Sequence, residues 1–119
     1  MQNGKMTHLT DNGNARMVDI TDKEPTLRIA IARGEVILAV ETLHLIEEQK
    51  VKKGDVVSVA RIAGILAAKK TFELIPLCHN IHVNEIIVDI ELDEQLPGLI
   101  VTVKIKTIER TGAEMEALT

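Results

Sequence analysis

The sequence predicts a single α+β domain built around an antiparallel β-sheet. Three observations support this fold class: alternating apolar residues near 27–32, helical spacing of apolar residues over 36–49 and 56–70, and two alternating segments joined by a short turn near residue 95. A chain of 119 residues is long enough for one compact core and too short for two. These elements are therefore expected to share one hydrophobic core.

The first predicted elements are an N-terminal arm and a half-buried strand. Residues 7–20 contain an Asn-Gly turn signal followed by strand-like alternation, which predicts a short strand or an ordered arm. Apolar residues alternate over 27–31, so a strand is expected here, with Arg28 on the face opposite its neighbours. Gly34 is expected in the turn that follows this strand.

Two helices are predicted between this strand and the rest of the sheet. A charged break at 50–55 separates a first helix over 36–49 from a second helix over 56–70. The second helix carries small residues along one face: Ala60, Gly64 and Ala67 or Ala68. Because glycine inside a helix costs about 1 kcal/mol relative to alanine, this face is expected to contact another backbone closely, either the sheet or a second subunit.

The second half of the chain predicts a connection, a hairpin and a last helix. Residues 74–79 are apolar but contain proline, which predicts a buried or half-buried connection. Apolar residues alternate over segments 86–92 and 99–105, which flank a turn, so an antiparallel hairpin is expected, with acids on one strand facing lysines on the other. Thr111 and Glu114 have the spacing of a capping box, so the last helix is expected to begin there.

Composition and charge exclude several classes of function. The content of 45% apolar and 27% charged residues is typical of a folded domain. A formal charge of −4 and a single aromatic residue disfavour nucleic acid as a partner. The chain has no long apolar run, no secretory signal pattern and one cysteine, so no membrane partner and a cytoplasmic location are expected.

Several chemically interesting side chains have simple structural explanations. Taken by itself, His79 is most simply a partly buried histidine bonded to backbone, and Cys78 is small core filler. Together with His82 they lack a fourth ligand and a zinc-like spacing, so no metal and no cofactor are expected. Glu114 is explained as the capping-box acid, whereas Glu116 has no such explanation and is the better functional candidate.

Three stretches in order carry a specific likeness to one family. They are Met17 to Ile20 followed by Lys23 and Arg28, the stretch from Lys53 through Gly64 to the Leu-Cys-His motif at 77–79, and the Glu-Met-Glu-Ala-Leu-Thr motif at 114–119. Over nearly its whole length the chain resembles the molybdenum cofactor biosynthesis protein C family. The resemblance implies a ferredoxin-like two-layer sandwich with helices packed on one face of an antiparallel sheet. It also implies a homo-oligomer, at least a dimer and expected as a hexamer built as a trimer of dimers.

The resemblance further implies a function in molybdenum cofactor biosynthesis. Members are lyases that convert a cyclised dihydroguanosine triphosphate into cyclic pyranopterin monophosphate and release pyrophosphate. The catalytic candidates that carry over are His79, Lys53 and Glu116. The substrate-binding candidates are Lys23, Arg28, Leu77, Cys78, His79, Met115 and Glu116. The competing hypothesis is a non-catalytic phosphate- or nucleotide-binding oligomeric module.

The sequence departs from the family pattern at two positions. Asn80 replaces the proline that usually follows Leu-Cys-His, and Arg110 replaces a lysine, which keeps the charge but changes the donor geometry. The family's catalytic aspartate and lysine belong to a helix and following segment expected after Thr119. Residues 1–119 are therefore expected to form one domain that binds phosphate without turning over substrate.

Overall fold

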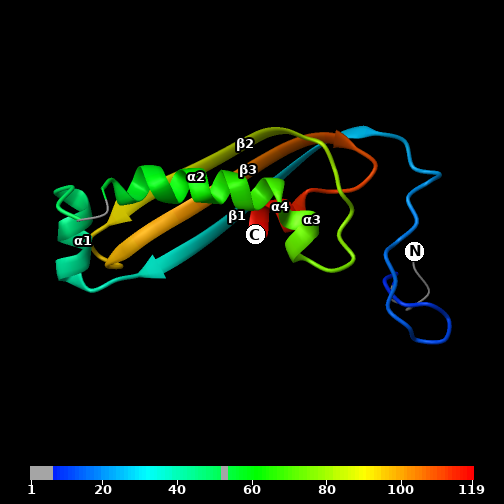
Figure 1. Cartoon of the computed structure of the whole chain (residues 1–119), viewed down its shortest axis with the longest axis horizontal. Coiled ribbons are helices and arrows are strands. Elements are labelled where there is room, and N and C mark those ends of the chain that lie inside the picture. Colours follow the sequence, from blue (N-terminus) through cyan, green and yellow to red (C-terminus); the bar gives the residue numbers. More distant parts are fainter. Residues whose placement is uncertain (1–6, 52–53) are drawn as a thin grey trace.

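The computed structural model describes residues 7–51 and 54–119 of the chain. Figure 1 shows the arrangement of the strands and helices that these residues form. In chain order the elements are β1 (Thr26–Ile37), α1 (Val40–Glu47), α2 (Val56–Lys69), α3 (Thr71–Leu74), β2 (Val83–Asp93), β3 (Gly98–Glu109) and α4 (Glu114–Leu118). None of the helices in these described ranges has the length and apolar character needed to cross a membrane.

The three strands form one antiparallel sheet with β3 at its centre, in the order β1-β3-β2. Helices α2, α3 and α4 lie over one face of the sheet, and α1 lies beyond the end of the hairpin (Figure 1). The predicted α+β class, with an antiparallel sheet and helices packed on one face, is confirmed. The arrangement is consistent with a ferredoxin-like two-layer sandwich.

The predicted hairpin is formed by β2 and β3, and its register matches the apolar pattern. Ile86 pairs with Ile105 on the face that the helices cover, while Glu85 pairs with Lys106 on the opposite face. Lys104 lies diagonally across, with its Nζ 3.9 Å from Oε1 of Glu85. These exposed charges contribute little stability, so the register is fixed mainly by the buried apolar residues.

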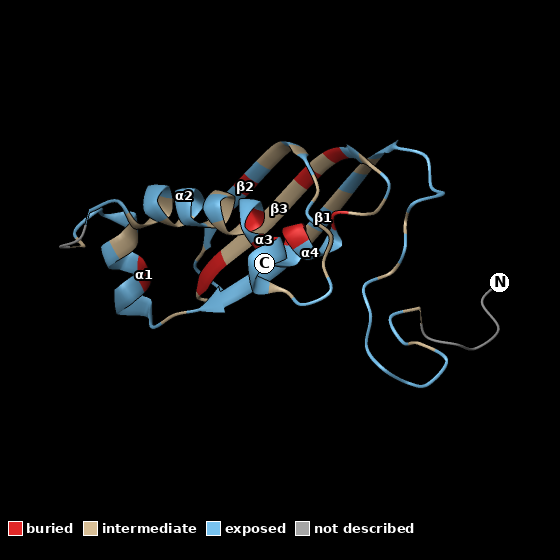
Figure 2. Cartoon of the chain, turned by 45° about the vertical axis from the view of Figure 1, so that its right-hand side comes forward, coloured by how far each residue is buried: buried red, intermediate tan, exposed pale blue. Residues whose placement is uncertain are grey.

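Two clusters of buried side chains lie between the sheet and the helices. The first consists of Leu43, Val88, Ile90 and Leu99. The second consists of Ala68, Ile105, Ala113 and Ala117. Because three members of the second cluster are alanines, α4 approaches the central strand closely there and α2 approaches α4. Figure 2 shows buried segments on β3 and on the short helix α4.

Strand β1 is longer and helix α1 is shorter than the sequence predicts. Gly34 pairs with Val101 inside the strand, so its predicted place in a turn is wrong. The strand continues to Ile37 because β3 offers hydrogen-bonding partners as far as Gly98. Helix α1 consequently begins only at Val40.

The small-residue face of α2 contacts the sheet. A Cβ atom added at Gly64 would lie 3.2 Å from Cγ2 of Val88 in β2. Ala60 packs against the first core cluster and Ala68 belongs to the second. The predicted close approach is therefore confirmed, with the sheet as the neighbour.

The predicted capping box at the start of α4 is wrong. The helix begins at Glu114 with Ala113 as its N-cap residue, and no side chain forms a capping hydrogen bond. The carboxylate of Glu114 instead lies close to Gly112. Glu114 therefore has no capping role, and its side chain is exposed.

Residues 7–25 form an extended arm. Of the two predicted alternatives, a short strand or an ordered arm, the structure shows the arm. An isolated bridge joins Leu9 and Ala15 around the Asn-Gly turn, where Gly13 has a φ of 80° that suits glycine. The arm runs away from the sheet (Figure 1) and is largely exposed (Figure 2). Its position relative to the domain therefore depends on a small number of polar contacts.

Candidate active site

The Leu-Cys-His motif lies on the loop between α3 and β2. The hydroxyl of Thr71, where α3 begins, lies 3.1 Å from the carbonyl oxygen of Ala67 and 3.0 Å from that of Ala68, which fixes the start of this loop to α2. Leu77 has a φ of 63°, in the left-handed region that is uncommon for a residue other than glycine. The chain therefore turns sharply at Leu77, and Cys78 follows directly.

Cys78 and Glu116 join the two motifs that are most specific in the sequence. The Cys78 thiol donates to the Glu116 carboxylate, with Sγ 3.5 Å from Oε2. Glu116 is only 4% exposed, and among the described residues no basic side chain forms an ion pair with it. A buried carboxyl group without a counter-ion is costly to ionise.

Burial is the main reason that the pKa of Glu116 is raised above its ordinary value. The negative charge of Glu114 acts in the same direction, while hydrogen bonds from its own backbone N–H and from the Cys78 thiol act against it. A carboxyl group with a raised pKa can exchange protons closer to neutral pH. Glu116 therefore has the properties of a general acid or base.

Burial also raises the pKa of the Cys78 thiol to about 11, and the charge of Glu116 and the hydrogen bond to it add to this effect. A thiol with so high a pKa is almost fully protonated at neutral pH and is a poor nucleophile. Cys78 thus acts as a hydrogen-bond donor to Glu116, and this contact fixes the carboxylate relative to the loop.

We expect Cys78 to react slowly with iodoacetamide in the folded protein. Raising its pKa from 9.0 to about 11 lowers the thiolate fraction at pH 8 about 100-fold. Mass spectrometry of native and urea-unfolded protein at this pH would measure the two rates, and the chain has no other cysteine to confuse them. Glu116→Gln should accelerate the native reaction because it removes the neighbouring charge. Equal native and unfolded rates would contradict the buried pair.

His79 ties the N-terminal arm to the loop. Its Nε2 lies 2.7 Å from the carbonyl oxygen of Val18. A carbonyl oxygen only accepts hydrogen bonds, so Nε2 carries the proton, and Nδ1 is left for a further partner. His79 is thus bonded to backbone, as expected from the residue alone, and still keeps one ring nitrogen for a ligand.

A hollow next to His79 is lined by the arm residues 17–21 and by Arg110. The carboxylate in this lining, Asp19, accepts hydrogen bonds from the backbone and the hydroxyl of Thr21, which also lower its pKa. Arg110 is therefore the cation in the lining. It was not among the predicted site residues, although its replacement of a family lysine was a signal that could have identified it.

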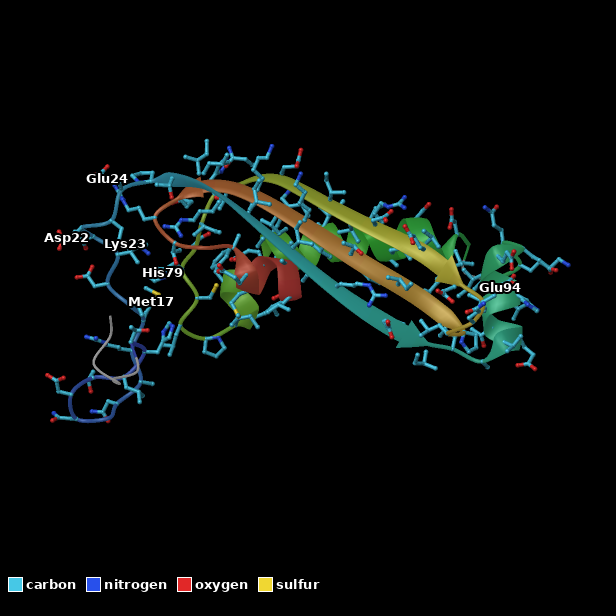
Figure 3. The ribbon with its side chains drawn as sticks, turned by 180° about the vertical axis from the view of Figure 1, so that it is seen from behind. Met17, Asp22, Lys23, Glu24, His79 and Glu94 are labelled. Atoms are coloured by element: carbon cyan, nitrogen blue, oxygen red, sulfur yellow. The ribbon has the colours of Figure 1, made fainter. Side chains whose placement is uncertain are left out.

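The two predicted cations Lys23 and Arg28 are not part of this lining. Figure 3 shows Lys23 and His79 at the same end of the molecule. The Nε of Arg28 donates to the carbonyl oxygen of Glu109 at 3.2 Å, which places Arg28 beside the strand end that leads to Arg110. This end of the molecule therefore carries three cations that an anionic ligand could contact: Lys23, Arg28 and Arg110.

The remaining predicted site residues are less closely involved. Leu77 is 39% exposed and Met115 is 41% exposed, so both offer apolar surface on the outside of the loop and of α4. Lys53 lies outside the described residues. The backbone N–H of His82 donates to the Glu109 carboxylate, so His82, Cys78 and His79 have separate polar partners.

Comparisons with known proteins agree on one family. The model of the MoaC family matches residues 17–119. A Methylobacterium nodulans protein named cyclic pyranopterin monophosphate synthase is 53% identical over 114 residues, which cover 96% of this chain and 71% of that relative. A Thermomicrobium roseum protein of the same name is 51% identical over 115 residues, covering 97% of this chain and 69% of the relative. A Dinoroseobacter shibae protein, also of that name, is 52% identical over 114 residues.

Proposed function

The chain belongs to the MoaC family, and from this premise we propose that it acts as a cyclic pyranopterin monophosphate synthase, a lyase of molybdenum cofactor biosynthesis. The reaction converts a cyclised dihydroguanosine triphosphate into cyclic pyranopterin monophosphate and releases pyrophosphate. The name shared by the relatives favours this enzyme over a non-catalytic phosphate-binding module. The observation that carries the proposal is the contact between Cys78 and Glu116, which brings two family motifs together at a buried acid.

The side chains divide into two groups with different tasks. Lys23, Arg28 and Arg110 position the triphosphate by charge, and His79 in its doubly protonated form donates a further hydrogen bond through Nδ1. Glu116 exchanges protons with the ring system as it is rebuilt, because its raised pKa suits proton transfer. Lys53 joins the first group by resemblance to the family.

A direct test compares two proteins. One is the chain of residues 1–119, and the other is the same chain continued with the C-terminal segment of the Thermomicrobium roseum relative. Each is incubated with the cyclised triphosphate, and released pyrophosphate is measured. Both proteins should bind pyrophosphate, and the extended one should turn over, since the resemblance places a catalytic aspartate and lysine after Thr119. Binding without turnover by both would favour the non-catalytic module.

Replacing Arg110 with alanine is expected to weaken pyrophosphate binding by about 1.5–3 kcal/mol, the usual contribution of a charge-assisted hydrogen bond. Calorimetric titration of pyrophosphate into both proteins measures the difference. Arg33→Ala is the control, because Arg33 is half exposed, pairs with Glu35 at 2.9 Å and lies on the opposite half of β1 from Arg28. An unchanged affinity in Arg110→Ala would remove this residue from the site.

Self-association is part of the same proposal. The outward side of α2 exposes three apolar residues at helical spacing, Val59, Ile62 and Leu66, at 59%, 60% and 51%. Because Ala30 and Ala32 face the helices, the alternating residues Leu27, Ile29 and Ile31 face the opposite side of the sheet, where all three are exposed. A trimer of dimers uses two different interfaces, and these two apolar surfaces suit that requirement.

We expect the protein to be at least a dimer, and a hexamer when both surfaces are covered. Ile62→Lys and Ile29→Lys should each reduce the mass measured by light scattering after size exclusion, since a charge on an apolar interface is costly. Thr42→Lys, at an exposed position of helix α1 outside both apolar surfaces, serves as the control. A wild-type monomer, or the wild-type mass in both variants, would contradict this assembly.

A cytoplasmic location also belongs to the proposal. The single cysteine is free and hydrogen-bonded to Glu116, so the described fold depends on no disulfide. Proteins of this kind need no oxidising compartment.

A further inference from the structure

A second group of metal-ligating side chains lies far from the candidate active site. His44 and Glu47 on α1 and Glu94 in the β2–β3 turn each have a ligand atom in the group, and these atoms all lie within 4.8 Å of one another. Figure 3 shows Glu94 beside α1, at the opposite end of the molecule from His79. This group of side chains is therefore separate from the candidate active site.

The elements that carry these side chains are fixed to the domain. Leu43, the residue before His44, is 1% exposed and belongs to the first core cluster, which anchors α1. Oδ1 of Asp93 accepts hydrogen bonds from the backbone N–H groups of Gln95 and Leu96 at 2.9 and 3.0 Å, which holds the turn around Glu94. The backbone N–H of Leu38 donates to the carbonyl oxygen of Pro97 at 3.0 Å and joins the turn to the start of α1.

The two carboxylates in this group have no basic partner among the residues that the structure describes. Glu47 and Glu94 also line a common hollow next to α2. Arg61 lines the same hollow and keeps its charge there; its Nε donates to the carbonyl oxygen of Val88 at 3.0 Å, and no ion pair joins it to either described carboxylate. The neighbouring acid Glu48, by contrast, pairs with a lysine at 3.0 Å. Glu47 and Glu94 repel each other, and a cation between them would remove that repulsion.

We propose that His44, Glu47 and Glu94 bind a divalent transition-metal ion of the zinc class. One imidazole nitrogen and two carboxylate oxygens are a donor set that zinc accepts, whereas magnesium and calcium prefer oxygen ligands alone. Residues at positions i and i+3 of a helix lie on the same side, so α1 presents two ligands together. Zinc bonds of about 2.0–2.2 Å need only a small inward rotation of these exposed side chains. Water fills the remaining position.

Bound metal would join α1 to the hairpin and stabilise the folded protein. The site bridges two elements that are not adjacent in the sequence, and a ligand that binds only the folded state stabilises it by mass action. The proposed metal site takes no part in the proposed synthase reaction. Binding can therefore be measured in the chain itself, without an activity assay.

The test is calorimetric titration of zinc into untagged protein, with the melting temperature recorded with and without the metal. Wild type should bind one zinc ion per chain, with a higher melting temperature in zinc. Glu94→Gln and His44→Gln should each weaken zinc binding by more than about tenfold, since losing a ligand costs at least as much as losing a residue that only orients a ligand. Both replaced side chains are exposed, so neither change should affect folding.

Glu48→Gln and His8→Gln are the matched controls, because they remove an exposed acid just after the same helix and an exposed histidine from the arm. Both should bind zinc as wild type does. Wild type that binds no zinc, or wild-type affinity in Glu94→Gln and His44→Gln, would overturn the proposal. Equal binding of magnesium and zinc by wild type would overturn the assignment of the metal class.

Discussion

Glu116→Gln is expected to lower kcat by about 100- to 10 000-fold, the usual contribution of a general acid or base. Glutamine keeps the shape and can still accept the hydrogen bond from Cys78, but it cannot exchange a proton. Pyrophosphate affinity should remain close to wild type, because the phosphate-binding cations come from the arm and the strand ends. Steady-state kinetics of the extended protein with the cyclised triphosphate, together with pyrophosphate calorimetry, separates these two effects.

Glu114→Gln is the matched control, since Glu114 lies on the same helix but is exposed. It should retain most of the turnover, with only a small change because its charge helps to raise the pKa of Glu116. Turnover in Glu116→Gln comparable to that of the control would rule out proton transfer at this residue. A combined loss of affinity and turnover would indicate a binding role instead.

The same substitution has a signature in stability. Because the pKa of Glu116 is raised on folding, the folded protein binds this proton more tightly than the unfolded chain does. Its contribution to stability is complete below the ordinary value of 4.5 and is lost as the pH rises through the raised value. Urea unfolding at a series of pH values should show wild type losing stability relative to Glu116→Gln over that window. If the free energy of unfolding changed with pH in the same way for both proteins, the pKa of Glu116 would not be raised on folding.

Much of the fold was predictable because its signals are local. The alternation of β2 and β3 around a turn predicts both strands and their register, since a shift by one residue would expose the buried set. Gly64 predicts a close contact, and Val88 provides it. The length of β1 was not predictable, because its continuation to Ile37 depends on partners in β3 that are distant in the sequence.

The candidate site was only partly predictable for the same reason. Glu116 was identified by family resemblance and by the lack of a structural explanation, but its contact with Cys78 joins residues far apart in the chain. The partner of His79 is the backbone carbonyl of Val18. Every residue has a backbone carbonyl group, so the sequence does not reveal which one accepts this hydrogen bond. The capping-box prediction failed because the same spacing occurs without the backbone geometry that a cap requires.

Ile105→Ala is expected to reduce the free energy of unfolding by about 2–5 kcal/mol, the range for truncating a fully buried aliphatic side chain. Ile105 is 0% exposed and lies on the central strand, paired with Ala30 on one side and Ile86 on the other. The helix residues above it are alanines, which are too short to fill the cavity that the substitution leaves. Urea unfolding followed by circular dichroism measures the loss.

Ile108→Ala is the control, because Ile108 is on the same strand but 56% exposed, and its loss should change stability by less than about 0.5 kcal/mol. Ile105 also supports Ala113 and Ala117, which flank the buried acid of α4. A helix as short as α4 is held by packing rather than by its own propensity. Cys78 should therefore react faster with iodoacetamide in folded Ile105→Ala than in Ile108→Ala. Equal stability and equal reactivity in the two variants would show that the alanine-rich cluster does not hold the candidate site together.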